Sequence, residues 1–82
     1  MGATMDAKEL ISFMVKSIVD QPDLVRVNGV EGECSVVLEL HVAKNDMGKV
    51  IGKEGKTISA IRTILNATRA QKSKRHILEL LE

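Results

Sequence analysis

The stretch Val50-Ile51-Gly52-Lys53-Glu54-Gly55-Lys56-Thr57-Ile58 places two glycines three residues apart, between an apolar pair and the start of an amphipathic helical pattern. Glycine has no Cβ and tolerates positive φ, so a Gly-x-x-Gly turn lets a ligand approach the backbone closely. The helix expected after the turn directs unpaired N–H groups and the positive end of its dipole at the same place. This arrangement favours an anion, and phosphate is the commonest one. The alternative is that the glycines only connect two helices, because short glycine motifs are loose.

Basic residues are concentrated around this turn, although the net charge of the chain is only +1. Residues 44–75 contain nine Lys and Arg residues and two acids, whereas residues 1–43 contain three basic residues and seven acids. A basic block centred on a glycine turn is typical of a nucleic-acid footprint. A run of charge is more often only a solvated surface, but its coincidence with the turn favours the phosphate interpretation.

Length and composition predict one small domain, because 82 residues support a single core. We expect residues 5–82 to form this domain and residues 1–4 to be a disordered N-terminal extension. Phe13 is the single aromatic residue and Cys34 the single cysteine, so the core is aliphatic and no internal disulfide is possible. The sequence shows no possible internal disulfide, no signal peptide and no apolar run of about 18 residues. These features predict a cytoplasmic protein that is not inserted in a membrane. No ligand spacing indicates a metal site.

The first half of the chain predicts one helix and a hairpin. Apolar residues recur at intervals of three and four over residues 6–20, which indicates an amphipathic helix ended by Pro22. Residues 24–28 and 34–42 alternate and are rich in Val, as strands are. We expect them to pair as an antiparallel hairpin, joined through residues 28–33 by a loop of more than two residues.

The second half predicts two helices and an ambiguous tail. Asn45 or Asp46 can cap a short helical turn that ends at Ile51, and a long amphipathic helix follows over residues 56–71. Residues 77–81 suit a helix by propensity, yet the polar break before them suggests a short strand. A third strand reached by a helical crossover could lie parallel to the second strand and complete the sheet.

The order of these elements, with the motif Val50–Gly55 followed by Ile58 and Ile61, resembles a K-homology (KH) domain of the bacterial type II arrangement. The resemblance covers residues 5–82, and the two ends of this range are similar to those of the bacterial KhpA family of small, single-domain RNA-binding proteins. It implies an α+β fold of order α-β-β-α-α-β, with a three-stranded mixed sheet covered on one face by helices. It also implies that the ambiguous tail is the last strand.

The resemblance also assigns three groups of RNA-binding residues. A turn that clamps the sugar-phosphate backbone of about four nucleotides falls on Gly52, Lys53, Glu54 and Gly55. An aliphatic groove floor for unstacked bases falls on Val50, Ile51, Ile58 and Ile61. Basic residues that would hold phosphates fall on Lys49, Lys53 and Lys56 at the clamp, and on Lys72, Lys74 and Arg75 at the far rim of the groove.

Some of these residues also have structural interpretations. Glu54 is an acid where a phosphate should bind, so we expect it to lower affinity while the glycine backbone still supplies donors. Ile58 and Ile61 are expected to belong first to the core, with only an edge toward the groove. Gly48 could permit close packing of a helix on the sheet, and Cys34 is expected to be a half-buried small hydrophobic residue.

Three classes of function remain open. The resemblance implies non-enzymatic binding of single-stranded RNA, with an RNA-chaperone role and no cofactor. Gly55-Lys56-Thr57 matches the end of a nucleotide-binding Walker A motif, but Val50 stands where that motif needs its first glycine. The third class is a dimerisation module with little RNA affinity, because the resemblance implies self-association. It also implies pairing with KhpB, a larger KH-containing partner, in control of cell-wall growth and cell length.

Overall fold

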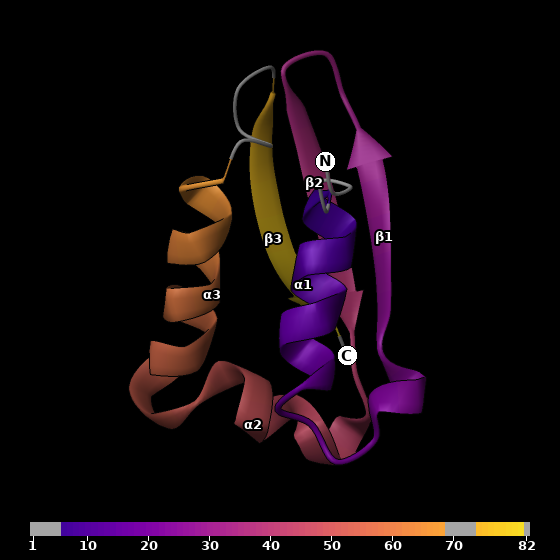
Figure 1. The fold of residues 1–82 in the computed structure, drawn as a ribbon, viewed down its shortest axis with the longest axis vertical. Helices are drawn as coiled ribbons and strands as arrows, with labels where there is room; N and C mark the ends of the chain where they lie inside the picture. The colour runs from indigo at the N-terminus through magenta and orange to yellow at the C-terminus, as the bar shows by residue number, and fades with distance from the viewer. Residues whose placement is uncertain (1–5, 69–73, 82) are drawn as a thin grey trace, which may run out of the picture.

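The computed structural model describes residues 6–68 and 74–81, which form three helices and three strands with short 3₁₀ turns between them (Figure 1). The helices and strands are α1 (Ala7–Lys16), β1 (Arg26–Glu31), β2 (Ser35–His41), α2 (Met47–Ile51), α3 (Lys56–Asn66) and β3 (Arg75–Leu81). The 3₁₀ turns are Pro22–Leu24, Lys44–Asp46 and Lys53–Gly55. This order confirms the predicted α-β-β-α-α-β arrangement. The extension expected at residues 1–4 lies outside the described residues.

Helix α1 begins at a capping box and ends earlier than predicted. Asp6 accepts a hydrogen bond from the Glu9 backbone N–H, and the Glu9 side chain accepts one from the Asp6 N–H, which satisfies two donors at the helix start. The helix ends at Lys16 and not near residue 20. After Lys16, the Ile18 N–H donates to the Val15 carbonyl at 3.1 Å, an i→i−3 bond of the kind that tightens the last turn of a helix.

The sheet has the order β1-β2-β3, with β1 antiparallel and β3 parallel to the central strand β2. The pairing of β3 with β2 runs in register from Ser35–Arg75 to His41–Leu81. This pairing confirms the tail as a strand, because a packed partner strand outweighs the helical propensity of residues 77–81. No helix in residues 6–68 or 74–81 is long and apolar enough to span a membrane.

The hairpin differs from the prediction in its turn. Asn28 and Gly29 lie inside β1, paired with Glu39 and Leu38, so the connection is confined to residues 32–34. Cys34 in this turn is exposed, and its expected half-burial is therefore wrong.

One aliphatic core lies between the helices and one face of the sheet. Figure 1 shows α1 lying across the front of the sheet, with α3 alongside it near β3. Because side chains alternate along a strand, Leu38, Leu40 and Leu78 point to this covered face, where all three are buried. The helical residues buried against them are Ala7, Ile11 and Val15 of α1, Val50 of α2, and Ile58, Ile61 and Leu65 of α3.

The segment that leads into α2 is anchored by a buried carboxylate. Asp46 is only 1% exposed, and its two oxygens accept hydrogen bonds from the backbone N–H groups of Asp20 at 3.1 Å and Gln21 at 3.0 Å. Asp46 stands at the N-cap position of α2, but its side chain does not cap that helix. The prediction of a capping role is therefore wrong. Asp46 instead ties the connection after α1 to the start of α2, which carries the glycine turn.

Candidate nucleic-acid interface

The glycine turn between α2 and α3 has three residues with positive φ. Gly52 has φ 77° and ψ 171°, Glu54 has φ 59° and ψ 26°, and Gly55 has φ 74° and ψ 13°. A Cβ added to Gly52 would lie 2.2 Å from Thr57 Oγ1 and 2.8 Å from the Thr57 nitrogen, whereas one added to Gly55 would meet nothing within 4 Å. Gly52 is therefore required both by its backbone angles and by its close contact with the start of α3.

The hydrogen bonds of the turn show which donors remain for a ligand. The Gly52 N–H donates to Gly48 O at 2.8 Å, the Gly55 N–H to Gly52 O at 3.1 Å, and the Lys56 N–H to Lys53 O. The expectation that the glycine N–H groups supply donors is therefore wrong, because both are used inside the turn. No side chain caps the start of α3, so the positive end of its dipole is open to an anion.

The side chains of the turn face solvent. Lys53 and Glu54 are exposed, and Lys56 lies 3.7 Å from the Glu54 carboxylate. Lys49 on α2 forms a similar ion pair with Asp20 at 3.6 Å. Among the residues described, Lys53 forms no ion pair, so its charge is the most available of the lysines at the clamp.

The four residues expected to form a groove floor divide into core and surface. Val50 is fully buried, and Ile58 and Ile61 are 8% and 5% exposed, whereas Ile51 is 39% exposed. The expected core role of Ile58 and Ile61 is confirmed. Ile51 offers apolar surface beside the turn, and Val50 supports the turn from inside the core. Gly48 has open space around it, so its expected role in close packing is wrong.

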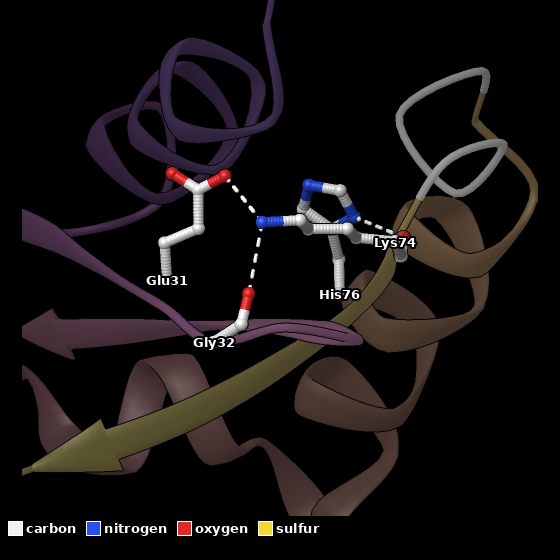
Figure 2. A network of polar contacts seen from close by, with 4 residues as sticks. All are labelled: Glu31, Gly32, Lys74 and His76. Carbon is white, nitrogen blue, oxygen red and sulfur yellow. Dashed lines mark hydrogen bonds and ion pairs between the residues drawn. The ribbon is translucent and has the colours of Figure 1, made fainter.

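The far rim places Lys74 against the hairpin turn. Its Nζ donates to Glu31 Oε2 at 2.6 Å and to Gly32 O at 2.8 Å (Figure 2). The hydrogen bond and the charge of Lys74 lower the pKa of the Glu31 carboxyl below its ordinary value of 4.5. The Lys74 ammonium is thus held by two acceptors of the hairpin. Arg75 is exposed at the start of β3, and Lys72 lies outside the described residues.

A cleft of about 140 Å³ between α3 and β3 contains polar groups that the sequence reasoning missed. Arg62 Nη2 donates to the Leu78 carbonyl at 3.2 Å, and Asn66 lines the cleft together with Arg75, which was already predicted for the far rim. Arg62 belongs to the basic block of the sequence. Its place beside β3 depends on the crossover packing, so residue type alone could not have singled it out.

A second surface is apolar and lies between α1 and α3. Phe13 is 62% exposed, Ile18 39% and Ile64 46%, and they line a shallow groove of about 310 Å³. We call these three residues the helix patch. Exposed aliphatic and aromatic side chains that gather on one surface mark interaction sites. The described residues contain no group of three or more His, Cys, Asp or Glu side chains placed to hold a metal ion.

Comparisons with known proteins found one family model and several relatives. The family model described as KhpA/KhpB, KH domain, matches residues 8–80. A protein of Borreliella burgdorferi named RNA-binding protein KhpA is 50% identical over 74 residues, which cover 90% of each chain. Its namesake in Clostridium acetobutylicum is 49% identical over 74 residues, which cover 90% of this chain and 99% of the relative. The protein of the same name in Chlamydia pneumoniae is 45% identical over 75 residues, which cover 92% of this chain and 96% of the relative. No solved structure matches this chain.

Proposed function

Because this chain belongs to the KhpA/KhpB KH-domain family, we propose that it binds single-stranded RNA, without catalysing a reaction, through the glycine turn and the groove beside it. The observation that carries this proposal is the uncapped start of α3 directly behind the Gly52–Gly55 turn. Relatives that span nearly the whole of this chain are named RNA-binding proteins.

In the proposed complex, each part of the site has its own task. The backbone of one strand lies over residues 52–55, where the missing side chains of the glycines admit phosphate close to the start of α3. Lys53 contacts phosphate directly, and Lys49 and Lys56 add charge from either side. Bases lie against Ile51 and extend along α3 toward Arg75. Lys72 and Lys74 complete the far rim, with the Lys74 ammonium held against the hairpin turn.

The finer functional proposal follows from the family resemblance. We propose that the protein acts as an RNA chaperone with a KhpB-type partner, in post-transcriptional control of cell-wall growth and cell length. The family model that matches this chain is described for both KhpA and KhpB, so the proposed KhpB-type partner would carry a KH domain of the same family.

The test replaces both variable residues of the turn, Lys53→Asp with Glu54→Asp. We expect affinity for a labelled single-stranded RNA, measured by fluorescence anisotropy, to fall by at least about ten-fold, because two carboxylates then face the phosphates. The matched control is Lys8→Asp on the exposed side of α1, which changes the net charge equally but lies outside the site. Both variants should keep the melting temperature of the wild type. Equal binding by the double variant and the wild type would place the RNA elsewhere.

The helix patch supports a second candidate function, which is self-association into a homodimer. A dimer would present two clamps, and avidity would compensate for the few contacts that one small domain makes. We expect Ile64→Glu to shift the protein toward monomer in analytical ultracentrifugation, because the patch would have to bury a charge. Val30→Glu is the control, since Val30 is 53% exposed on β1, outside the patch. A wild type that is monomeric at every concentration would exclude this candidate.

A further inference from the structure

Acidic side chains form ion pairs with three lysines of the proposed site. The described residues contain three ion pairs, and each joins an acid to a lysine that the proposed site uses: Asp20–Lys49, Glu54–Lys56 and Glu31–Lys74. An RNA phosphate that binds one of these ammonium groups must therefore compete with a carboxylate already beside it. Phosphate and carboxylate accept the same charge-assisted hydrogen bonds from lysine.

Asp20 is the acid that the fold positions most firmly beside the clamp. Its backbone N–H donates to Asp46 Oδ1 at 3.1 Å, and that of Gln21 donates to Asp46 Oδ2 at 3.0 Å. Asp46 is 1% exposed and immediately precedes α2, the helix that carries Lys49. Asp46 therefore anchors both the backbone of Asp20 and the start of the helix that carries Lys49, although Asp20 and Lys49 are distant in the sequence.

The other two pairs are less informative about the clamp. Glu54 belongs to the turn itself, so replacing it also changes a backbone position with positive φ. The pair of Lys74 and Glu31 lies at the hairpin turn, at the other end of α3 from the glycine turn (Figure 1). Asp20 is outside the turn, and its side chain is 78% exposed, so it can be changed without disturbing the core or the clamp.

We propose that Asp20 is an affinity-setting residue, whose carboxylate takes the position at Lys49 that an RNA phosphate occupies in the complex. This inference rests on the RNA-binding function proposed above. The Lys49 side chain is 47% exposed, so a phosphate can reach it. An exposed ion pair is weak in water, so RNA displaces the carboxylate at a modest loss of affinity.

The chain provides a matched control three residues away. Asp23 is exposed in the same connection between α1 and β1, and its carboxylate forms no ion pair with any described residue. Asp20→Asn and Asp23→Asn each remove one negative charge. Their difference isolates the competition at Lys49 from the general effect of charge, and asparagine preserves the backbone N–H that Asp46 binds.

The experiment measures the affinity of both variants for a labelled single-stranded oligouridine by anisotropy at several salt concentrations. We expect Asp20→Asn to bind two- to five-fold more tightly than Asp23→Asn, the range that an exposed ion pair supports. The plot of log K against log salt should have the same slope for both variants, because the same phosphate contact with Lys49 forms in each complex. Adding Lys49→Gln to Asp20→Asn should abolish this gain. Lys49→Gln alone should weaken the binding of the wild type much less than it weakens the binding of Asp20→Asn.

The outcomes separate this inference from the function on which it rests. Equal affinities of the two variants, with RNA binding that is still lost in the variant Lys53→Asp with Glu54→Asp, would overturn the role of Asp20 alone. If neither the wild type nor Asp20→Asn bound RNA, both the function and the inference would fail. Melting curves identical to that of the wild type would show that the variants compare the same folded protein.

Discussion

At the scale of single residues, the two glycines of the turn have different tasks. Gly52, with φ 77° and ψ 171°, lies in a region of backbone conformation that is almost restricted to glycine, and Thr57 also leaves no room for a Cβ. Gly55 has left-handed angles but open space around it. The first glycine therefore shapes the turn against α3, whereas the second sets only the direction in which α3 begins.

This difference predicts unequal effects of alanine at the glycines. Gly52→Ala should lower the free energy of unfolding by about 3 kcal/mol or more, because strain and a steric clash add. Gly55→Ala should cost about 1–2 kcal/mol from left-handed strain alone. Gly48→Ala in α2, where a Cβ meets nothing, should be neutral or stabilising by up to about 1 kcal/mol. Urea unfolding measures all three, and equal losses at Gly52 and Gly55 would contradict the assignment.

At the scale of elements, much of the fold was predictable from the sequence. Periodicity found both long helices and the face of β2 that carries Leu38 and Leu40, because alternation and helical spacing reflect burial directly. The identity of β3 required the family resemblance, since its local propensity is ambiguous and only its pairing with β2 decides it. The early end of α1 coincides with the i→i−3 bond from the Ile18 N–H to the Val15 carbonyl, which spacing does not reveal.

The site was predictable in its center and not in its surroundings. The Gly-x-x-Gly turn is contiguous in the sequence, so motif and structure coincide. Two of the three carboxylates that pair with lysines of the site come from distant parts of the chain, as Glu31 does for Lys74 across 43 residues. Such pairs depend on tertiary packing, and a count of basic residues cannot show that some charges already have partners.

The contact between β3 and the hairpin predicts a pH dependence of stability. Lys74 lowers the pKa of Glu31 below 4.5, so the ion pair stabilises the folded state above the unfolded pKa, and this contribution is lost as pH falls through the folded pKa. The melting temperature of Glu31→Gln should therefore lie below that of the wild type at pH 6. The difference should narrow as pH is lowered from about 5 to about 3. Glu33→Gln in the same turn is the control, and a pH-independent difference for Glu31→Gln would argue against the ion pair.

At the scale of the whole molecule, a net charge of +1 hides the uneven distribution on which RNA binding depends. If the turn clamps about four nucleotides, the slope of log K against log salt should be near −3, at about 0.7 per phosphate on a single strand. Lys53→Asp with Glu54→Asp should flatten this slope as well as weaken binding, because fewer counterions are then released. Lys8→Asp should leave the slope unchanged. Anisotropy titrations between about 50 and 200 mM salt span the range in which such slopes are resolved. A slope near zero would mean that the basic block is only a solvated surface, and it would favour the helix patch as the main functional surface of the protein.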